Sequence, residues 1–276
     1  MENSKYNKVV ILSASKFSAY SLSVIYLLNK NGIKIDLILV KSLGGKKRIL
    51  KEFKTNGFDL FRKIYKKIIL QFLMKFGFKS KNIDGFSEFY NECNFNFSSI
   101  EKYAKKHQIA YIETTDFHLV SNINLILKLQ TDLIVFTGGG LLRQNLINTA
   151  KFGVINCHMG ILPEYRGMDC NYWAVLNKEY QNIGFTVHLI DFGVDTGPII
   201  HKYYIDPFDF SSINDLYKHI EYSLAKAIVD GILEVFSDNV KYELQKISSG
   251  RQYYTITKEL KAFAEKQFKK SKKYLV

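Results

Sequence analysis

Short apolar runs that alternate with helical patterns limit the fold of this chain more than any other feature. Residues 8–13 (KVVILS) form a β-branched apolar run, and residues 35–40 (IDLILV) form a second one after a turn at Asn31-Gly32. The apolar residues between them have helical spacing: Tyr20, Val24, Ile25 and Leu28. This order of elements predicts an α/β fold, in which a mostly parallel sheet is covered by helices on both faces.

Two later segments extend this pattern and indicate where a site would form. Residues 132–137 (DLIVFT) precede three glycines and a short helical pattern, and residues 153–158 (GVINCH) form another strand pattern. Active sites of such sheets lie outside the carboxyl ends of the strands. With 276 residues, 47% of them hydrophobic, the chain has enough material for one catalytic core plus additions.

The formal charge of +13 is concentrated in two segments. Residues 46–81 hold twelve Lys and Arg against two acids, and residues 258–276 hold seven Lys against two acids. The rest is near neutral, so the charge does not predict nucleic-acid binding by the catalytic region. We expect the terminal lysines, residues 269–273, to form a solvated tail.

An apolar helical stripe runs through the basic insertion. Its members are Phe61, Ile64, Tyr65, Ile68, Ile69, Phe72, Leu73 and Phe76. One interpretation is an inserted helix that packs on the domain. The others are a basic amphipathic helix in peripheral contact with a membrane or a protein partner, and a homodimer interface.

The chain has no apolar run of the roughly 20 residues that a membrane span requires, and residues 1–8 are polar. We therefore expect a cytoplasmic protein. Cys93, Cys157 and Cys170 have neither metal-ligand spacing nor an even count, so we expect free thiols.

Asn156 and His158 stand two residues apart at the end of an apolar strand pattern, which places both side chains on one face. An amide donor beside an imidazole suits acyl transfer, where one group holds a developing oxyanion and the other manages a proton. About thirty residues later, an alternating strand pattern runs into a glycine-bearing loop with Asp191 and Asp195. A carboxylate there would orient the imidazole. The alternative is an ordinary loop with a structural histidine.

These two segments together resemble the folate-dependent formyltransferase family, most of all over residues 132–205. The shared features are Asn-x-His at Asn156 and His158, the Leu-Pro-x-Tyr-Arg-Gly loop at residues 162–167, and the Asp-x-Gly-Pro that ends at Pro198. The resemblance implies a Rossmann-like formyltransferase domain over residues 1–206, with residues 46–81 inserted. Residues 207–276 would be a short, mostly helical C-terminal addition.

The family resemblance implies formyl transfer from 10-formyltetrahydrofolate to an amine, without a metal. Asn156, His158 and Asp195 would be catalytic. The donor would lie beside two loops, whose candidate contacts are Gly139, Gly140, Leu141, Leu142, Asp191 and Val194. In the first loop, glycines permit close approach of a flat heterocycle, although they also suit a tight turn.

The acceptor is narrowed by what the chain lacks. Only 70 residues follow residue 206, too few for the C-terminal barrel of methionyl-tRNA formyltransferases, and residues 13–19 lack the glycines of glycinamide ribonucleotide formyltransferase. Residues 250–254 (GRQYY) resemble sugar formyltransferases, so we expect a nucleotide-linked amino-deoxysugar, such as those of lipopolysaccharide biosynthesis. Tyr165 and Arg166 are candidate acceptor contacts, or else loop-packing residues. The alternatives are a methionyl-tRNA formyltransferase, a glycinamide ribonucleotide formyltransferase and a formyltetrahydrofolate hydrolase.

Overall fold

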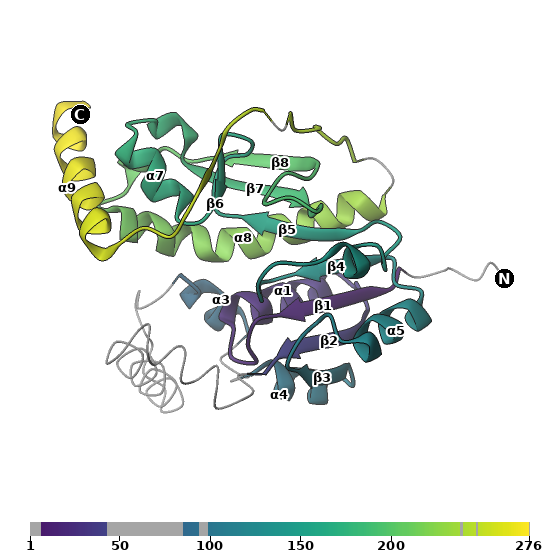
Figure 1. The fold of residues 1–276 in the computed structure, drawn as a ribbon. Coiled ribbons are helices and arrows are strands. Elements are labelled where there is room, and N and C mark those ends of the chain that lie inside the picture. Colours follow the sequence, from purple (N-terminus) through teal and green to yellow (C-terminus); the bar gives the residue numbers. More distant parts are fainter. Residues whose placement is uncertain (1–6, 43–84, 94–98, 238–239, 247, 276) are drawn as a thin grey trace.

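A mostly parallel sheet of seven strands forms the centre of the protein in a computed structural model (Figure 1). The strand order is β3-β2-β1-β4-β5-β7-β8, and β7 alone runs opposite to the direction of the other six strands. The strands are β1 (Val9–Ser13), β2 (Ile35–Lys41), β3 (Ala110–Thr114), β4 (Leu133–Phe136), β5 (Val154–His158), β7 (Gly184–Leu189) and β8 (Ile199–Tyr204). A separate pair joins β6 (Tyr165–Gly167) to β9 (Arg251–Tyr253). The predicted α/β class is confirmed.

The structure describes residues 7–42, 85–93, 99–237, 240–246 and 248–275. The basic insertion, residues 46–81, lies outside these ranges. Its amphipathic helix, the peripheral membrane contact and the homodimer interface therefore stay predictions.

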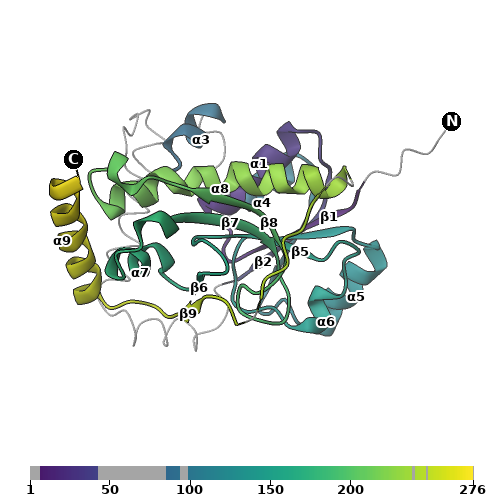
Figure 2. The same cartoon turned by 90° about the horizontal axis from the view of Figure 1, so that it is seen from above.

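Alternate residues of the strands enter two cores on opposite faces of the sheet. Val9 and Ile11 of β1 belong to the larger core, whereas Val10 and Leu12 belong to the smaller one. The helices are α1 (Ala19–Lys30), α3 (Ser87–Glu92), α4 (Ile100–Lys106), α5 (Val120–Leu129), α6 (Gln144–Ile147), α7 (Cys170–Leu176), α8 (Ile213–Phe236) and α9 (Lys258–Leu275). Figure 2 shows α1, α4 and α8 on one side of the sheet and α5 and α6 on the other.

Serine side chains define where two of the long helices begin. Ser18 accepts a hydrogen bond from the backbone N–H of Ser21 at the start of α1, and Ser212 accepts one from Asp215 at the start of α8. The apolar face of α8 packs against α1 and β5. Although α8 follows residue 206, it therefore completes the main core; the domain division at that position stays a prediction.

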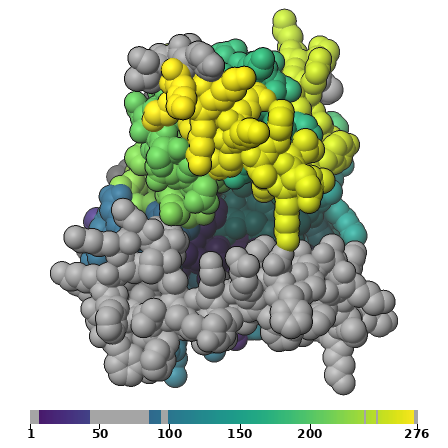
Figure 3. Space-filling view, turned by 90° about the vertical axis from the view of Figure 1, so that its left-hand side faces the viewer, coloured from purple at the N-terminus to yellow at the C-terminus, as the bar shows by residue number. Residues whose placement is uncertain are grey.

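Helix α9 lies on the outside at one end of the molecule (Figures 1 and 3) and packs against α7. Phe268 and Ala264 are its buried side chains. Lys269, Lys270 and Lys273 are exposed, as expected, but the segment continues this helix and does not form a separate tail. Nζ of Lys272 donates to the carbonyl oxygens of Phe208 and Phe210 at 2.6 and 2.9 Å. These contacts satisfy two backbone acceptors. The spacing of residues in the sequence could not predict that Lys272 would reach them.

The described residues include no helix long and apolar enough to cross a membrane. Cys93, Cys157 and Cys170 are buried free thiols, as predicted.

Candidate active site

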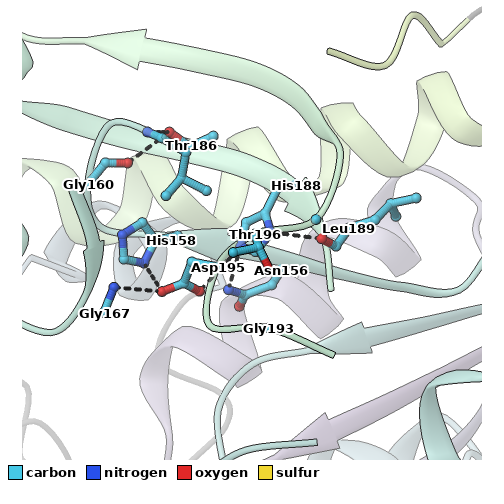
Figure 4. Close-up of polar contacts among 12 residues, drawn as sticks. Asn156, His158, Gly160, Gly167, Thr186, His188, Leu189, Gly193, Asp195 and Thr196 are labelled. Atoms are coloured by element: carbon cyan, nitrogen blue, oxygen red, sulfur yellow. Dashed lines mark hydrogen bonds and ion pairs between the residues drawn. The ribbon is translucent and has the colours of Figure 1, made fainter. Parts of the chain in front are cut away.

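Asn156 and His158 lie at the carboxyl end of β5 and project from one face of the sheet, while Cys157 points to the other face. Strand β5 pairs with β4 on one side and with β7 on the other. The antiparallel register sets Asn156 opposite His188, and His158 opposite Thr186. Figure 4 shows Asn156, His158 and His188 gathered around the carboxylate of Asp195. The fold thus brings the three predicted catalytic residues together.

Both ring nitrogens of His158 face hydrogen-bond acceptors. Nε2 lies 2.9 Å from the carbonyl oxygen of Tyr165, and Nδ1 lies 3.3 Å from Oδ2 of Asp195. A neutral imidazole carries one N–H, so only the protonated ring donates to both acceptors at once. Because Nε2 is fixed on a backbone carbonyl, Nδ1 is the nitrogen that can exchange its partner for a substrate atom.

Asp195 is held through both its backbone and its carboxylate. Its φ of 54° lies in the left-handed region, which Asp tolerates better than most residues. Oδ2 accepts a hydrogen bond from the backbone N–H of Gly167 at 2.9 Å. Gly167 has a φ of 95°, and a Cβ there would collide with the carbonyl group of Tyr253. The glycine that ends the LPEYRG segment therefore brings a backbone donor to the carboxylate.

The loop that carries Asp195 is closed by a second carboxylate. Oδ1 of Asp191 accepts hydrogen bonds from the backbone N–H of Gly193 at 3.0 Å and from the hydroxyl of Thr196 at 2.6 Å. This side chain thus shapes the loop. The predicted donor contacts of Asp191 and Val194 stay predictions.

His188 is a functional candidate that the sequence hypothesis missed. Its Nδ1 lies 2.8 Å from the carbonyl oxygen of Leu189, so Nδ1 carries the proton and Nε2 accepts. Nε2 lies 3.2 Å from Nδ2 of Asn156, which must donate to it. Burial lowers the pKa of His188 to about 4, which keeps the ring neutral near pH 7. His188 therefore fixes the orientation of the Asn156 amide.

A single signal in the sequence pointed to His188, namely its place in the alternating strand pattern of residues 184–189. The antiparallel pairing of β7 with β5 sets it opposite Asn156, and no local pattern reveals that pairing.

Tyr165 and Arg166 pack against other parts of the chain, as the loop-packing alternative expects, and their contact with an acceptor stays a prediction. The Tyr165 side chain is 1% exposed, and its hydroxyl donates to Oε2 of Glu179 at 2.8 Å. Arg166 is 6% exposed, and its Nη2 donates to the carbonyl oxygens of Lys246 and Ser249 at 3.3 and 2.7 Å. Both are loop-packing residues, because the C-terminal segment covers them.

Three glycines after β4 form a loop that other residues could not adopt without strain. Gly138, Gly139 and Gly140 have φ values of 112°, 133° and 102°. A Cβ at Gly139 would lie 2.5 Å from the ring of Phe117, and the carbonyl oxygen of Gly139 accepts from Nζ of Lys41 at 2.8 Å.

A pocket of about 610 Å³ opens beside this glycine loop. Its lining consists of Lys41, Thr115, Asp116, Phe117, His118, Gly139, Leu141, Leu142, Arg143, Gln144 and Phe192. Gly139, Leu141 and Leu142 were predicted donor contacts, whereas Gly140, Asp191 and Val194 do not line it. Leu141 and Phe192 are 78% and 80% exposed, so a flat ligand there would cover apolar surface.

Three serines at and after the end of β1 form hydrogen bonds within the chain. The hydroxyl of Ser13 donates to that of Ser21 at 2.8 Å, both residues are fully buried, and Ser18 caps α1. They do not form an open phosphate site. Among the described residues, no group of three or more His, Cys, Asp or Glu side chains could hold a metal ion.

Comparison with known proteins agrees with this geometry. The sequence model that describes formyl transferases matches residues 97–232, the region that contains Asn156, His158 and Asp195. This match places residues 97–232 in the formyl transferase family.

The curated relatives of this chain include two kinds of enzyme. The methionyl-tRNA formyltransferase of Azobacteroides pseudotrichonymphae genomovar. CFP2 is 29% identical over 145 residues, which are 52% of this chain and 44% of that protein. The bifunctional polymyxin resistance protein ArnA of Wigglesworthia glossinidia brevipalpis is 28% identical over 155 residues, 56% of this chain and 24% of that protein. The chain thus spans less than half the length of either relative.

A solved structure shares the fold over nearly the whole chain. The N-formyltransferase from Helicobacter canadensis, in complex with folinic acid and dTDP-3-aminofucose, superposes with a TM-score of 0.57 at 15% identity. The superposition covers 97% of this chain and 82% of that one. The Rossmann-like formyltransferase fold is therefore confirmed.

Proposed function

We propose that this protein transfers a formyl group from 10-formyltetrahydrofolate to an amine, with Asn156, His158 and Asp195 as its catalytic residues. The observation that carries the proposal is the convergence of these three side chains at the carboxyl end of β5, where Nδ1 of His158 lies 3.3 Å from Asp195. Family membership supports the same reaction.

In the proposed reaction, the lone pair of the acceptor amine attacks the formyl carbon, and the carbonyl π electrons move to its oxygen. Asn156 donates one Nδ2–H to His188 and directs the other to this oxyanion. The protonated Nδ1 of His158 is the second donor. Asp195 holds Nδ1 of His158 before the substrate binds, stabilises the imidazolium charge after Nδ1–H has turned to the oxyanion, and accepts through water the proton that the amine loses.

The tetrahedral intermediate then collapses. The oxyanion electrons reform the carbonyl, the bond from carbon to N10 of the folate breaks, and N10 takes up, through water, the proton that Asp195 had accepted. The products are a formamide and tetrahydrofolate. Each preorganised donor to the oxyanion contributes roughly 3 to 4 kcal/mol of transition-state stabilisation.

The pocket beside the glycine loop is our candidate for the donor. Leu141 and Phe192 offer exposed apolar surface for a flat ring, and the absent Cβ at Gly139 keeps the wall thin. Lys41 and Arg143 also line the pocket, and these cations suit the carboxylates of the glutamate that the folate carries.

For the acceptor we infer a nucleotide-linked amino-deoxysugar. What supports this choice is the GRQYY segment, the lack of an open phosphate site after β1, and the fold shared with a neighbour that binds dTDP-3-aminofucose. The curated relatives favour initiator tRNA as the second candidate acceptor. We also propose that the protein is cytoplasmic.

Mass spectrometry of the product tests the proposal. The purified protein is incubated with 10-formyltetrahydrofolate and separate nucleotide-linked 3-amino and 4-amino deoxysugars, charged initiator tRNA, or buffer alone. We expect one sugar to gain the mass of a formyl group in place of hydrogen. If only the tRNA is formylated, the acceptor is tRNA and the proposed sugar acceptor is wrong. Release of formate at the same rate without any amine would replace the transferase with a hydrolase.

A further inference from the structure

The chain between α8 and β9 returns to the active site from outside the region that the family model matches. We call residues 240–253 the return segment; residue 247 lies outside the described part. Glu243 exchanges two backbone hydrogen bonds of 2.9 Å with Ile199 at the edge of β8. The segment then reaches β6, where β9 pairs with it (Figure 1). The family match ends at residue 232, well before the segment starts.

One side chain of the return segment clamps the loop of Asp195. Nε2 of Gln245 donates to the backbone carbonyl oxygen of Asp195 at 3.1 Å and to that of Gly197 at 2.6 Å. The two N–H bonds of a single amide thus span the turn around the carboxylate. Gly197 is tightly placed, because a Cβ there would collide with the carbonyl group of Leu189.

The other active-site loop fixes the return segment in turn. Nη2 of Arg166 holds the carbonyl oxygens of Lys246 and Ser249, and the backbone N–H of Arg251 donates to the carbonyl oxygen of Glu164 at 3.0 Å. The segment is therefore anchored directly after Gln245, on the loop whose Tyr165 carbonyl holds the ring of His158.

The backbone conformation of Asp195 depends on contacts such as those of Gln245. A residue other than glycine with a φ of 54° keeps that conformation only where its surroundings impose it. The carboxylate of Asp195 accepts from Gly167, but the Gln245 amide is what holds its backbone carbonyl. We propose that Gln245 is a positioning residue, which holds the backbone of Asp195 so that the carboxylate stays on Nδ1 of His158. This inference rests on the proposed function of the triad.

Three variants test the inference. Gln245→Met removes both N–H donors at similar volume, and Gln245→Lys restores donors without an acceptor. Leu244→Ala is the matched control, because this neighbouring side chain is 77% exposed. We expect Gln245→Met to lower kcat about tenfold, the factor expected from losing one to two neutral hydrogen bonds. The KM for the folate should change less than about twofold. Gln245→Lys should recover most of kcat, and Leu244→Ala should match the wild type.

A double-mutant cycle with Asp195→Asn separates positioning from general support of the fold. If Gln245 acts through Asp195, Gln245→Met should cost less than about twofold in the Asp195→Asn background. A loss of the same size in both backgrounds, or wild-type kcat in Gln245→Met, would overturn the inference.

A readout without turnover keeps this inference distinct from the proposed function. The nitrogen NMR signals of the His158 ring are followed against pH in the wild type and in Gln245→Met. If the His158 titration differs between Gln245→Met and the wild type but the wild type forms no formamide, formyl transfer is rejected and the positioning role of Gln245 is kept. If the wild type is active but the His158 titration is the same in Gln245→Met, the positioning role of Gln245 is rejected and formyl transfer is kept.

Discussion

A chain of three groups sets the orientation of Asn156. The carbonyl oxygen of Leu189 fixes the proton of His188 on Nδ1, and Nε2 of the same ring then accepts from the Asn156 amide. An amide that faced the other way would place its oxygen against this lone pair. The donor proposed for the formyl oxygen is thus selected by a buried histidine that itself contacts no substrate in the proposal.

His188 should also make stability depend on pH. Its pKa falls from 6.5 when the ring is in the unfolded chain to about 4 when it is buried. Between these values the unfolded chain binds more protons, so the free energy of unfolding rises with pH through this window and is lost as pH falls. The contribution is about 3 kcal/mol. Urea unfolding from pH 4 to 7 measures it.

His188→Gln removes this titration, so its unfolding free energy should vary less between pH 4 and 6.5 than that of the wild type. The comparison uses the slope of each variant, because the substitution also changes packing. Equal slopes would mean that folding does not lower the pKa of His188, which would contradict the desolvated, neutral ring described above.

At the residue scale, the sequence was sufficient to single out Asn156, His158 and Asp195, which the fold brings together, and their catalytic role stays a proposal. It was insufficient for His188 and Gln245, whose roles depend on strand pairing and on a segment that returns from far along the chain. It left two roles open for Tyr165 and Arg166, because their burial by that same segment, which favours loop packing, has no local signature.

The elements around the site depend on a few backbone positions. The loop after β4 combines three positive φ values with close contact between Gly139 and Phe117. The predicted tight turn is therefore present, and the missing side chain at Gly139 leaves room for the Phe117 ring. Close approach of the folate to these glycines stays a prediction.

Gly139→Ala and its neighbour Gly140→Ala separate the two costs in this loop. Both substitutions impose strain on a positive φ, of about 1 to 2 kcal/mol. Only Gly139→Ala adds a collision with the Phe117 ring, since the nearest atom to a Cβ at Gly140 lies 3.9 Å away. We expect Gly139→Ala to lose roughly 1 to 3 kcal/mol more in urea unfolding. Equal losses would show that the ring moves aside without cost.

Asp169 ties helix α9 to the rest of the molecule. Its Oδ1 accepts from Nζ of Lys261 at 2.7 Å, and its Oδ2 accepts from the backbone N–H of Ile256 at 3.0 Å. We expect Asp169→Ala to lower the free energy of unfolding by about 1 to 3 kcal/mol and to expose α9 to protease. Lys226→Ala is the control, because its pair with Glu88 is exposed and should contribute less than about 1 kcal/mol. A similar loss in both variants would contradict the assigned role of Asp169.

At the scale of the whole molecule, the sequence was enough for the parallel part of the sheet. Runs such as residues 8–13 and 35–40 are buried on both faces and bounded by turns, so their type follows from composition. The C-terminal part was harder, because α8 completes the main core and the return segment crosses back to β8 and β6. Such long-range contacts leave no periodic pattern.

The central claim is that Asn156, His158 and Asp195 form one catalytic unit for amine formylation. The most direct measurement is the rate of tetrahydrofolate formation with saturating 10-formyltetrahydrofolate, with and without the amine, for the wild type, His158→Gln and the exposed control His107→Gln. We predict amine-dependent turnover, a loss of about 10²- to 10³-fold in kcat for His158→Gln, and less than twofold change for the control. Wild-type kcat in His158→Gln would contradict the account.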